Sequence, residues 1–217
     1  MQTSARILVI DDHPIVRFGL QELLSQEIRM ASYHEASGVD DARQLLETQQ
    51  FDLIILDLSL KKGSALDFIK FIRKHYGNIP VLVLSMYNEI YYAERALRVG
   101  ANGYIMKEVI TTHLMDAIHT VMSGEIYLSE RMKKKLLKSF SGQPAREKGN
   151  FIAQLTDREL EVYQLIGQGL TTREIAEKLF LSIKTIETYK DNIKKKLKLS
   201  NSNELFKHAA HWHFKNI

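Results

Sequence analysis

The sequence predicts an α/β fold: a doubly wound (βα)5 domain with a parallel five-stranded sheet, joined by a linker to an all-α four-helix domain of helix-turn-helix type. Three observations predict it. Five short apolar runs alternate with helical patterns up to residue 123, four helical patterns without a strand follow residue 150, and a segment without apolar periodicity lies between them. Strands that alternate with helices are typical of parallel sheets. We therefore expect domains at 4–123 and 151–217, with a linker at 124–150.

Each expected strand is short and rich in Val, Ile or Leu, as is usual for strands buried on both faces. The runs are RILVI (6–10), SYHEA (32–36), DLIIL (52–56), VLVLS (81–85) and GYIM (103–106). Helical patterns follow them at about 13–26, 40–49, 64–76, 88–98 and 111–123. A further helix is expected at 126–138. The segment 141–150 contains Gly, Pro, Ser and charges without apolar periodicity, which is typical of a linker.

Composition excludes several functional classes. The chain has 217 residues, 45% of them hydrophobic, and no cysteine. A disulfide framework, thiol catalysis and a cysteine-based zinc site are therefore excluded, and a reducing compartment is expected. The N-terminal segment does not have the pattern of a secretory signal, and no apolar run is long enough to span a membrane. We expect a cytoplasmic protein without membrane attachment.

The distribution of charge divides the chain. Residues 1–129 contain 12 Lys or Arg and 16 Asp or Glu, whereas residues 130–150 contain 7 and 2, and residues 151–217 contain 11 and 8. An acidic first part followed by a basic second part favours two domains, with an anionic partner for the second. The basic segment 130–150 is interpreted as a charged tether. Docking on the acidic part, or contact with nucleic acid, are the alternatives.

Reactive side chains follow four of the expected strands. Asp11 and Asp12 follow the first, Asp57 the third, Ser85 ends the fourth and Lys107 follows the fifth. Because parallel strands end at one edge of a sheet, these groups should meet there. A single aspartate after a strand is more often a helix cap or a solvated loop residue, so the hypothesis depends on the whole group.

The chemistry of this group indicates phosphoryl transfer. Crowded carboxylates repel one another unless a cation lies between them, and an all-oxygen cluster suits Mg²⁺. Beside a metal ion, Asp57 can act as a nucleophile toward phosphorus and form an aspartyl phosphate. The Lys107 ammonium and the Ser85 hydroxyl would then hold the phosphoryl oxygens, so that catalysis is mostly positioning and charge neutralisation.

Residues 5–123 resemble a CheY-like receiver domain of bacterial response regulators. Four motifs carry the resemblance: DDH at 11–13, LIILDLSL at 53–60, VLVLS at 81–85 and GANGYIMK at 100–107. The resemblance implies that Asp57 accepts a phosphoryl group from a histidine kinase or a phosphotransfer protein. It implies Mg²⁺ on Asp12 and Asp57, with the Ser59 carbonyl and Asp11 assisting. It also implies that Ser85 and Tyr104 move together when Asp57 is phosphorylated.

The stretch 171–199 predicts a helix-turn-helix. Apolar positions in 172–179 and 183–197 define two short helices, and Ser182 is placed to cap the second. A helix of this kind fits the major groove of duplex DNA. Glu187 and Asp191 are unusual there, since acids repel phosphate; such an acid either accepts a hydrogen bond from cytosine N4 or pairs with a neighbouring lysine. The candidate DNA-contacting residues are Thr171, Thr172, Lys184, Thr185, Glu187, Thr188, Lys190, Asp191, Lys194 and Lys195.

Residues 155–205 resemble the LuxR-type DNA-binding domain through LTDRELEV, GLTTREIAEKL and the spaced residues of TIETY and KL. Together with the receiver, this is the layout of NarL/FixJ response regulators. The resemblance implies a DNA-binding transcription regulator rather than an enzyme. It also implies that the regulator binds duplex DNA and is a homodimer when it is phosphorylated or bound to DNA. The last helix, at about 202–213, is the expected dimer contact.

Other functions remain as alternatives. A constitutive DNA-binding regulator would use an atypical receiver only as a dimerisation module. A phosphatase with Asp57 as nucleophile is disfavoured, because Ser59 stands where that class places a second acid. An RNA-binding output domain is a third alternative. A metal site at His208, His211 and His213 is disfavoured because no acid completes the set.

Overall fold

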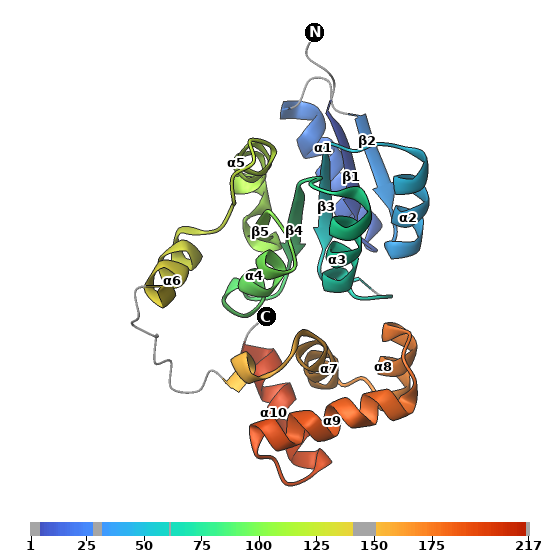
Figure 1. The fold of residues 1–217 in the computed structure, drawn as a ribbon, viewed down its shortest axis with the longest axis vertical. Helices are drawn as coiled ribbons and strands as arrows, with labels where there is room; N and C mark the ends of the chain where they lie inside the picture. The colour runs from blue at the N-terminus through green and yellow to red at the C-terminus, as the bar shows by residue number, and fades with distance from the viewer. Residues whose placement is uncertain (1–4, 28–31, 61, 141–150, 216–217) are drawn as a thin grey trace. The chain divides into compact units, whose positions relative to one another are not determined.

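A computed structural model describes residues 5–27, 32–60, 62–140 and 151–215, with the side chains of residues 139 and 140 left undescribed. The chain forms two compact units that divide between Phe140 and Ser141. The first contains a sheet and helices, and the second is helical (Figure 1). The predicted linker segment 141–150 lies outside the described residues. None of the described helices has both the length and the apolarity needed to cross a membrane.

The first unit contains the predicted parallel five-stranded sheet. Its strands are β1 (Arg6–Ile10), β2 (Ser32–Ala36), β3 (Leu53–Asp57), β4 (Val81–Ser85) and β5 (Gly103–Met106). They are ordered β2-β1-β3-β4-β5, and every neighbouring pair is parallel. The strand order reverses direction beside β1, and in open α/β sheets a ligand site lies at such a point, at the carboxyl ends of the strands.

Helices cover both faces of this sheet. They are α1 (Pro14–Glu27), α2 (Val39–Thr48), α3 (Ala65–Tyr76), α4 (Glu89–Arg98) and α5 (Ile110–Met122), with a short 3₁₀ turn η1 (Lys107–Val109) before α5. Leu20 and Leu24 of α1 pack with Leu114 and Ile118 of α5 against alternate residues of the strands. Right-handed crossovers place α2, α3 and α4 on the opposite face (Figure 1). Both faces are therefore buried, as the unbroken apolar strands predict.

Local sequence signals explain where these helices begin and end. The Ser64 hydroxyl accepts a hydrogen bond from Asp67 N at the start of α3, and the Asn88 side chain accepts one from Ile90 N at the start of α4. Helix α3 ends at Gly77, whose φ of 68° is accessible to glycine at little cost. The predicted helices agree with the observed ones to within one or two residues at most ends.

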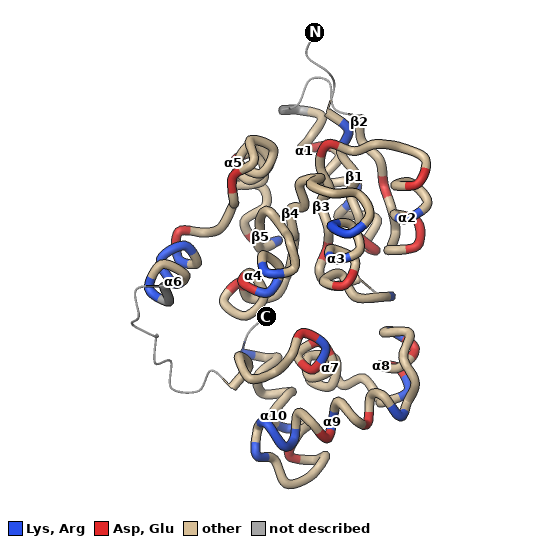
Figure 2. The backbone as a smooth tube through the Cα atoms, viewed as in Figure 1, with Lys and Arg blue, Asp and Glu red and all other residues tan. Residues whose placement is uncertain are grey.

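The segment after α5 closes the free edge of β5. Tyr127 forms a parallel bridge with Gly103, its N–H donates to Asn102 O, and its carbonyl accepts from Tyr104 N. The chain then enters α6 (Glu130–Phe140), which begins later than the predicted 126–138 because this edge segment precedes it. Helix α6 packs on α4: the Ser129 hydroxyl donates to Glu89 Oε1 at 2.6 Å. Figure 2 shows Lys and Arg residues along α6.

The second unit is the predicted bundle of four α-helices, preceded by a 3₁₀ turn η2 (Phe151–Gln154). Its helices are α7 (Asp157–Gly167), α8 (Thr172–Leu179), α9 (Ile183–Leu197) and α10 (Ser202–Lys215). Tyr163 is fully buried between α7 and α10; its hydroxyl lies 2.7 Å from His208 Nδ1, and its ring packs against Trp212. A capping box formed by Thr156 and Glu159 is present at the start of α7.

Candidate functional site

The carboxyl edge of the sheet brings together three acids and one lysine. Asp11 and Asp12 follow β1 directly, Asp57 is the last residue of β3, and Lys107 opens η1 after β5. The Lys107 ammonium lies 2.6 Å from Asp11 Oδ2 and 3.0 Å from Asp57 Oδ2. Asp11 and Asp57 are each only 1% exposed. Four residues from distant parts of the sequence thus form one buried charged cluster at the edge predicted for them.

Burial and neighbouring charges set the electrostatics of this cluster. Burial raises the pKa of Asp57 above its ordinary value; the Lys107 ammonium opposes this rise and the Asp11 carboxylate adds to it. Burial by itself lowers the pKa of Lys107, but the charges of Asp57 and Asp11 outweigh burial and raise it. Lys107 therefore stays charged near neutral pH and is bound between two carboxylates.

The cluster has a donor set that suits Mg²⁺. Ligand atoms of Asp11, Asp12, His13 and Asp57 all lie within 4.8 Å of one another. Carboxylate oxygens predominate, as Mg²⁺ prefers. Ser59, a predicted ligand through its carbonyl, is held beside them because its N–H donates to Asp57 Oδ1 at 3.0 Å. The residues present therefore fit a hard divalent cation.

His13 is a member of this cluster that the sequence analysis missed. Its Nδ1 lies 3.2 Å from Asp11 Oδ1 and 3.0 Å from Asp12 Oδ1, and its side chain is about half exposed. The third residue of the DDH motif carried the signal, since it follows two acids directly at the end of β1. His13 is therefore the most exposed side chain among the residues of this cluster, and it contacts two of its carboxylates.

The predicted switch residues, Ser85 and Tyr104, both contact Tyr87. The Ser85 hydroxyl accepts a hydrogen bond from Tyr87 N at 2.9 Å, and the Tyr104 hydroxyl donates to Tyr87 O at 2.6 Å. Ser85 is fully buried and Tyr104 is 1% exposed. Burial also raises the pKa of Tyr104, so its hydroxyl stays a neutral donor. Tyr87 was not predicted, but it joins the two residues that were.

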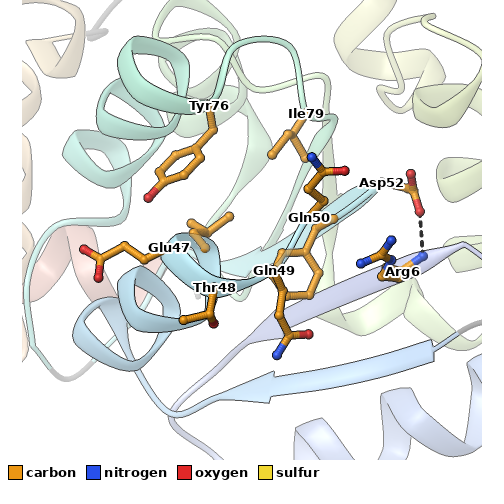
Figure 3. A pocket seen from close by; sticks show the side chains of 10 residues that line it. Arg6, Glu47, Thr48, Gln49, Gln50, Asp52, Tyr76 and Ile79 are labelled. Carbon is orange, nitrogen blue, oxygen red and sulfur yellow. Dashed lines mark hydrogen bonds between the residues drawn. The ribbon is translucent and has the colours of Figure 1, made fainter.

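A polar hollow lies at the opposite edge of the sheet (Figure 3). Arg6 at the start of β1 and Asp52 just before β3 line it, together with Gln49, Gln50 and Tyr76. Arg6 N donates to Asp52 Oδ2 at 2.7 Å. None of the residues predicted for phosphoryl transfer lines this hollow.

In the second unit, α8 and α9 form the predicted helix-turn-helix. Thr171 caps α8 and Ser182 caps α9, each accepting a hydrogen bond from a backbone N–H of the first turn. Between the helices, Phe180 has a φ of 54° and ends α8 in the left-handed conformation. Among the candidate DNA-contacting residues, six are exposed: Thr171, Lys184, Glu187, Thr188, Asp191 and Lys195. Thr172, Thr185, Lys190 and Lys194 are partly buried.

Several of these side chains contact one another. Lys190 Nζ lies 2.9 Å from Glu187 Oε1, and Lys194 Nζ lies 2.9 Å from Asp191 Oδ1. Of the two roles considered for these acids, the structure shows the pairing with lysine. Lys196, which follows Lys195, instead binds the buried Glu159 of α7. The basic face of α9 is thus partly neutralised within the protein.

Comparison with known proteins agrees with both units. Residues 7–119 match the family described as response regulator receiver domain, and residues 153–209 match the bacterial regulatory proteins of the luxR family. The chain therefore belongs to the response regulators of two-component systems that carry a LuxR-type DNA-binding domain. These are DNA-binding transcription regulators, and the predicted family is confirmed.

Individual relatives match along almost the whole chain. The oxygen regulatory protein NreC of Staphylococcus carnosus is 36% identical over 208 residues, which cover 94% of this chain and 96% of that protein. NreC of Staphylococcus aureus is 34% identical over the same shares. RcsB of Salmonella enterica serovar Typhimurium, solved on promoter rprA with the phosphomimetic BeF₃⁻, has a TM-score of 0.70 and 27% identity, covering 96% of this chain and 99% of that one. A second RcsB structure has a TM-score of 0.73 at 27% identity, covering 96% and 98%.

Proposed function

We propose that this protein is a phosphorylation-controlled transcription regulator in which Asp57 is the phosphoryl acceptor. The observation that carries the proposal is the Lys107 ammonium, bound between Asp11 and Asp57 at the sheet edge. This arrangement places a nucleophilic carboxylate beside a fixed positive charge, which is what transfer of an anionic group requires. The phosphoryl donor is a sensor histidine kinase or a phosphotransfer protein, or a small acyl phosphate in vitro.

The transfer step is an in-line displacement at phosphorus. A carboxylate oxygen of Asp57 attacks the phosphorus, and the bond from phosphorus to the donor's imidazole nitrogen breaks. The electron pair leaves with the imidazole, which then takes a proton. Lys107 and Ser85 hold the phosphoryl oxygens. When bound by Asp11, Asp12, Asp57 and the backbone of Ser59, Mg²⁺ supplies the positive charge that lets carboxylate and phosphoryl group approach.

Phosphorylation then acts on the loop between β4 and α4. The Ser85 hydroxyl accepts from Tyr87 N in this structure, so its own proton can be donated to a phosphoryl oxygen, and a turn of the Ser85 side chain toward that oxygen would loosen the Ser85–Tyr87 contact. The Tyr104 hydroxyl donates to the carbonyl oxygen of the same Tyr87. When the loop moves, this hydrogen bond is lost and the buried Tyr104 ring can shift. The phosphorylated conformation favours a homodimer that binds duplex DNA through α9, and it acts by shifting a pre-existing equilibrium. As a DNA-binding regulator, the protein acts in the cytoplasm.

The intact mass of the full chain tests the acceptor. We expect incubation with acetyl phosphate and Mg²⁺ to add one phosphoryl group, about 80 Da, to the wild-type protein. Asp57→Asn should gain no mass, because the amide cannot form the acyl phosphate. Asp67→Asn is the matched control, since Asp67 is a partly exposed acid on α3 and should leave the gain intact.

The same experiment distinguishes the proposal from its main alternative, a constitutive DNA-binding regulator. If folded wild-type protein gains no mass, the receiver is atypical, and constitutive DNA binding with the receiver as a dimerisation module is the better description. If Asp57→Asn still gains the phosphoryl group, the acceptor is another residue. Binding of a labelled duplex in competition with RNA of the same sequence tests the output domain, and preference for RNA contradicts the proposal.

A further inference from the structure

Glu187 lies in a closed ring of hydrogen bonds on the helix-turn-helix. Its Oε1 atom accepts from the Thr172 hydroxyl at 2.9 Å and from the Lys190 ammonium at 2.9 Å. The same ammonium also donates to the Thr172 oxygen at 2.9 Å. Thr172 is the first residue of α8, whereas Glu187 and Lys190 belong to α9. One carboxylate therefore joins the two helices, within the surface proposed to face DNA.

The two hydrogen-bond donors in this ring, the Thr172 hydroxyl and the Lys190 ammonium, are groups that commonly bind DNA phosphates. In helix-turn-helix proteins the first helix crosses the DNA backbone while the second enters the major groove. A hydroxyl at the first turn of a helix and a lysine ammonium beside it are typical phosphate contacts. In the free protein the Glu187 carboxylate accepts from both of these donors. Its pKa is held below the ordinary range, chiefly by Lys190, so it is ionised at neutral pH.

A displaced carboxylate in the major groove distinguishes between bases. Guanine presents two acceptors there and thymine presents an acceptor and a methyl group, so both disfavour an anion. Cytosine presents its N4 amino group, a donor that a carboxylate accepts well. Adenine has an amino group beside an acceptor nitrogen, a pattern that matches an amide rather than a carboxylate.

We propose that Glu187 is a specificity-determining residue for cytosine. On DNA, a backbone phosphate takes over the Thr172 hydroxyl and the Lys190 ammonium, and the released carboxylate accepts the N4 hydrogen of one cytosine per half-site. On other sequences the carboxylate meets an acceptor or repels the backbone, so binding is weakened. This inference rests on the proposed function, because it requires that α9 enters the major groove.

The test is selection of duplexes from a random library by the full chain, treated with acetyl phosphate and Mg²⁺. Wild type should enrich cytosine at one fixed position of each half-site, and replacing that cytosine should weaken binding at least about fivefold. Glu187→Ala should lose this preference. Glu187→Gln should move it toward adenine, because glutamine pairs with adenine N6 and N7. Circular dichroism confirms that each variant is folded.

Binding to random duplex provides a second readout. Without the carboxylate, Glu187→Ala should bind random duplex more tightly, and its salt dependence should steepen by about 0.9 in the logarithmic slope, as one further phosphate contact requires. Glu177→Gln is the matched control: Glu177 is an exposed acid on α8 that pairs with Arg173, and its loss should leave the cytosine preference unchanged.

The outcomes separate this inference from the proposed function. If wild type binds no duplex, the DNA-binding function fails and the inference fails with it. If wild type selects a sequence but Glu187→Ala selects the same bases with the same affinity, only the inference is wrong. If Glu187→Ala is folded yet binds neither selected nor random duplex, the hydrogen bonds of Glu187 serve to hold α8 against α9. The proposal that Glu187 distinguishes cytosine from other bases is then wrong.

Discussion

At the scale of single residues, Asp57 combines deep burial with a charge. Burial raises its pKa from the ordinary 3.8, so the native state binds a proton more tightly than the unfolded chain does. Its contribution to stability is therefore fully present below about pH 4 and is lost as pH rises through the raised pKa. The ionised Asp57 destabilises the metal-free protein near neutral pH.

Asp57→Asn should consequently stabilise the metal-free protein at pH 7, because a neutral amide of the same shape removes the buried charge. The midpoint of urea unfolding in EDTA, followed by circular dichroism, should rise at pH 7, and the difference should shrink toward pH 3. A lower midpoint for Asp57→Asn at pH 7 would mean that the Lys107 contact outweighs burial and that the pKa of Asp57 is not raised.

Lys107 has the opposite role, since it compensates two buried carboxylates. Lys107→Met should leave Asp11 and Asp57 without their shared ammonium and reduce the free energy of unfolding at pH 7 by about 3–5 kcal/mol. Lys70→Met, at an exposed lysine paired with Asp67, should change it by less than about 1 kcal/mol. Urea unfolding of the two variants measures both changes in the free energy of unfolding. Equal losses for Lys107→Met and Lys70→Met would contradict the interpretation of Lys107 as a buried ion-pair partner.

The contacts that sequence analysis missed have one property in common: they depend on tertiary packing. Asp11, Asp57 and Lys107 could be predicted, because each follows a strand and parallel strands end together. The contact of Tyr87 with Tyr104, and that of Thr172 with Glu187, depend on how a loop lies or how two helices cross. No periodicity in the chain encodes such a crossing, so only the structure shows these contacts.

At the scale of elements, helix α7 approaches α10 very closely at Gly167. A Cβ atom on Gly167 would lie 2.6 Å from the Ala209 carbonyl oxygen, a backbone atom that has little freedom to move. Gly19, in the middle of α1, has no heavy atom within 4 Å of the corresponding position. The two glycines are therefore a matched pair with opposite surroundings.

Gly167→Ala should destabilise the second unit by about 1–3 kcal/mol through overpacking. Gly19→Ala should stabilise the first unit by up to about 1 kcal/mol, because alanine favours a helix interior. Fluorescence of Trp212, the one tryptophan of the chain, reports unfolding of the second unit. A Gly167→Ala protein with unchanged fluorescence midpoint would show that α10 can shift without loss of packing.

Most elements were predictable because their signals are local. Apolar strands, the cap at Ser182 and helical spacing place the strands and most helix ends within a few residues. The segment at Tyr127 was not predicted as part of the sheet, because a single bridging residue has no periodicity. The later start of α6 follows from the same segment, which occupies the residues that the helical pattern had included.

At the scale of the whole molecule, the two compact units differ in what holds them together. The first is organised around a buried sheet whose charged edge contains the proposed acceptor Asp57, and the second around Tyr163 and its neighbours on α10. The charge difference in the sequence follows this division only in part, because the basic helix α6 belongs to the first unit. That difference was one of the signals that favoured two domains, and it was the signal for an anionic partner of the second.

The segment that contains Tyr127, between α5 and α6, also has a consequence for solubility. An open strand edge offers unpaired N–H and C=O groups to a second chain, and proteins commonly protect such edges against aggregation. Here the chain itself covers β5, and Ser129 then fastens α6 to α4. A receiver ended at residue 123 would leave Tyr104 N–H and Asn102 C=O uncovered, whereas one ended at residue 140 would keep them paired. We expect the shorter chain to self-associate on light scattering and the longer one to remain monomeric without phosphorylation. Residues 124–140 would then prevent the sheet from pairing edge to edge with other copies, although the charge pattern of 130–150 was interpreted as a tether.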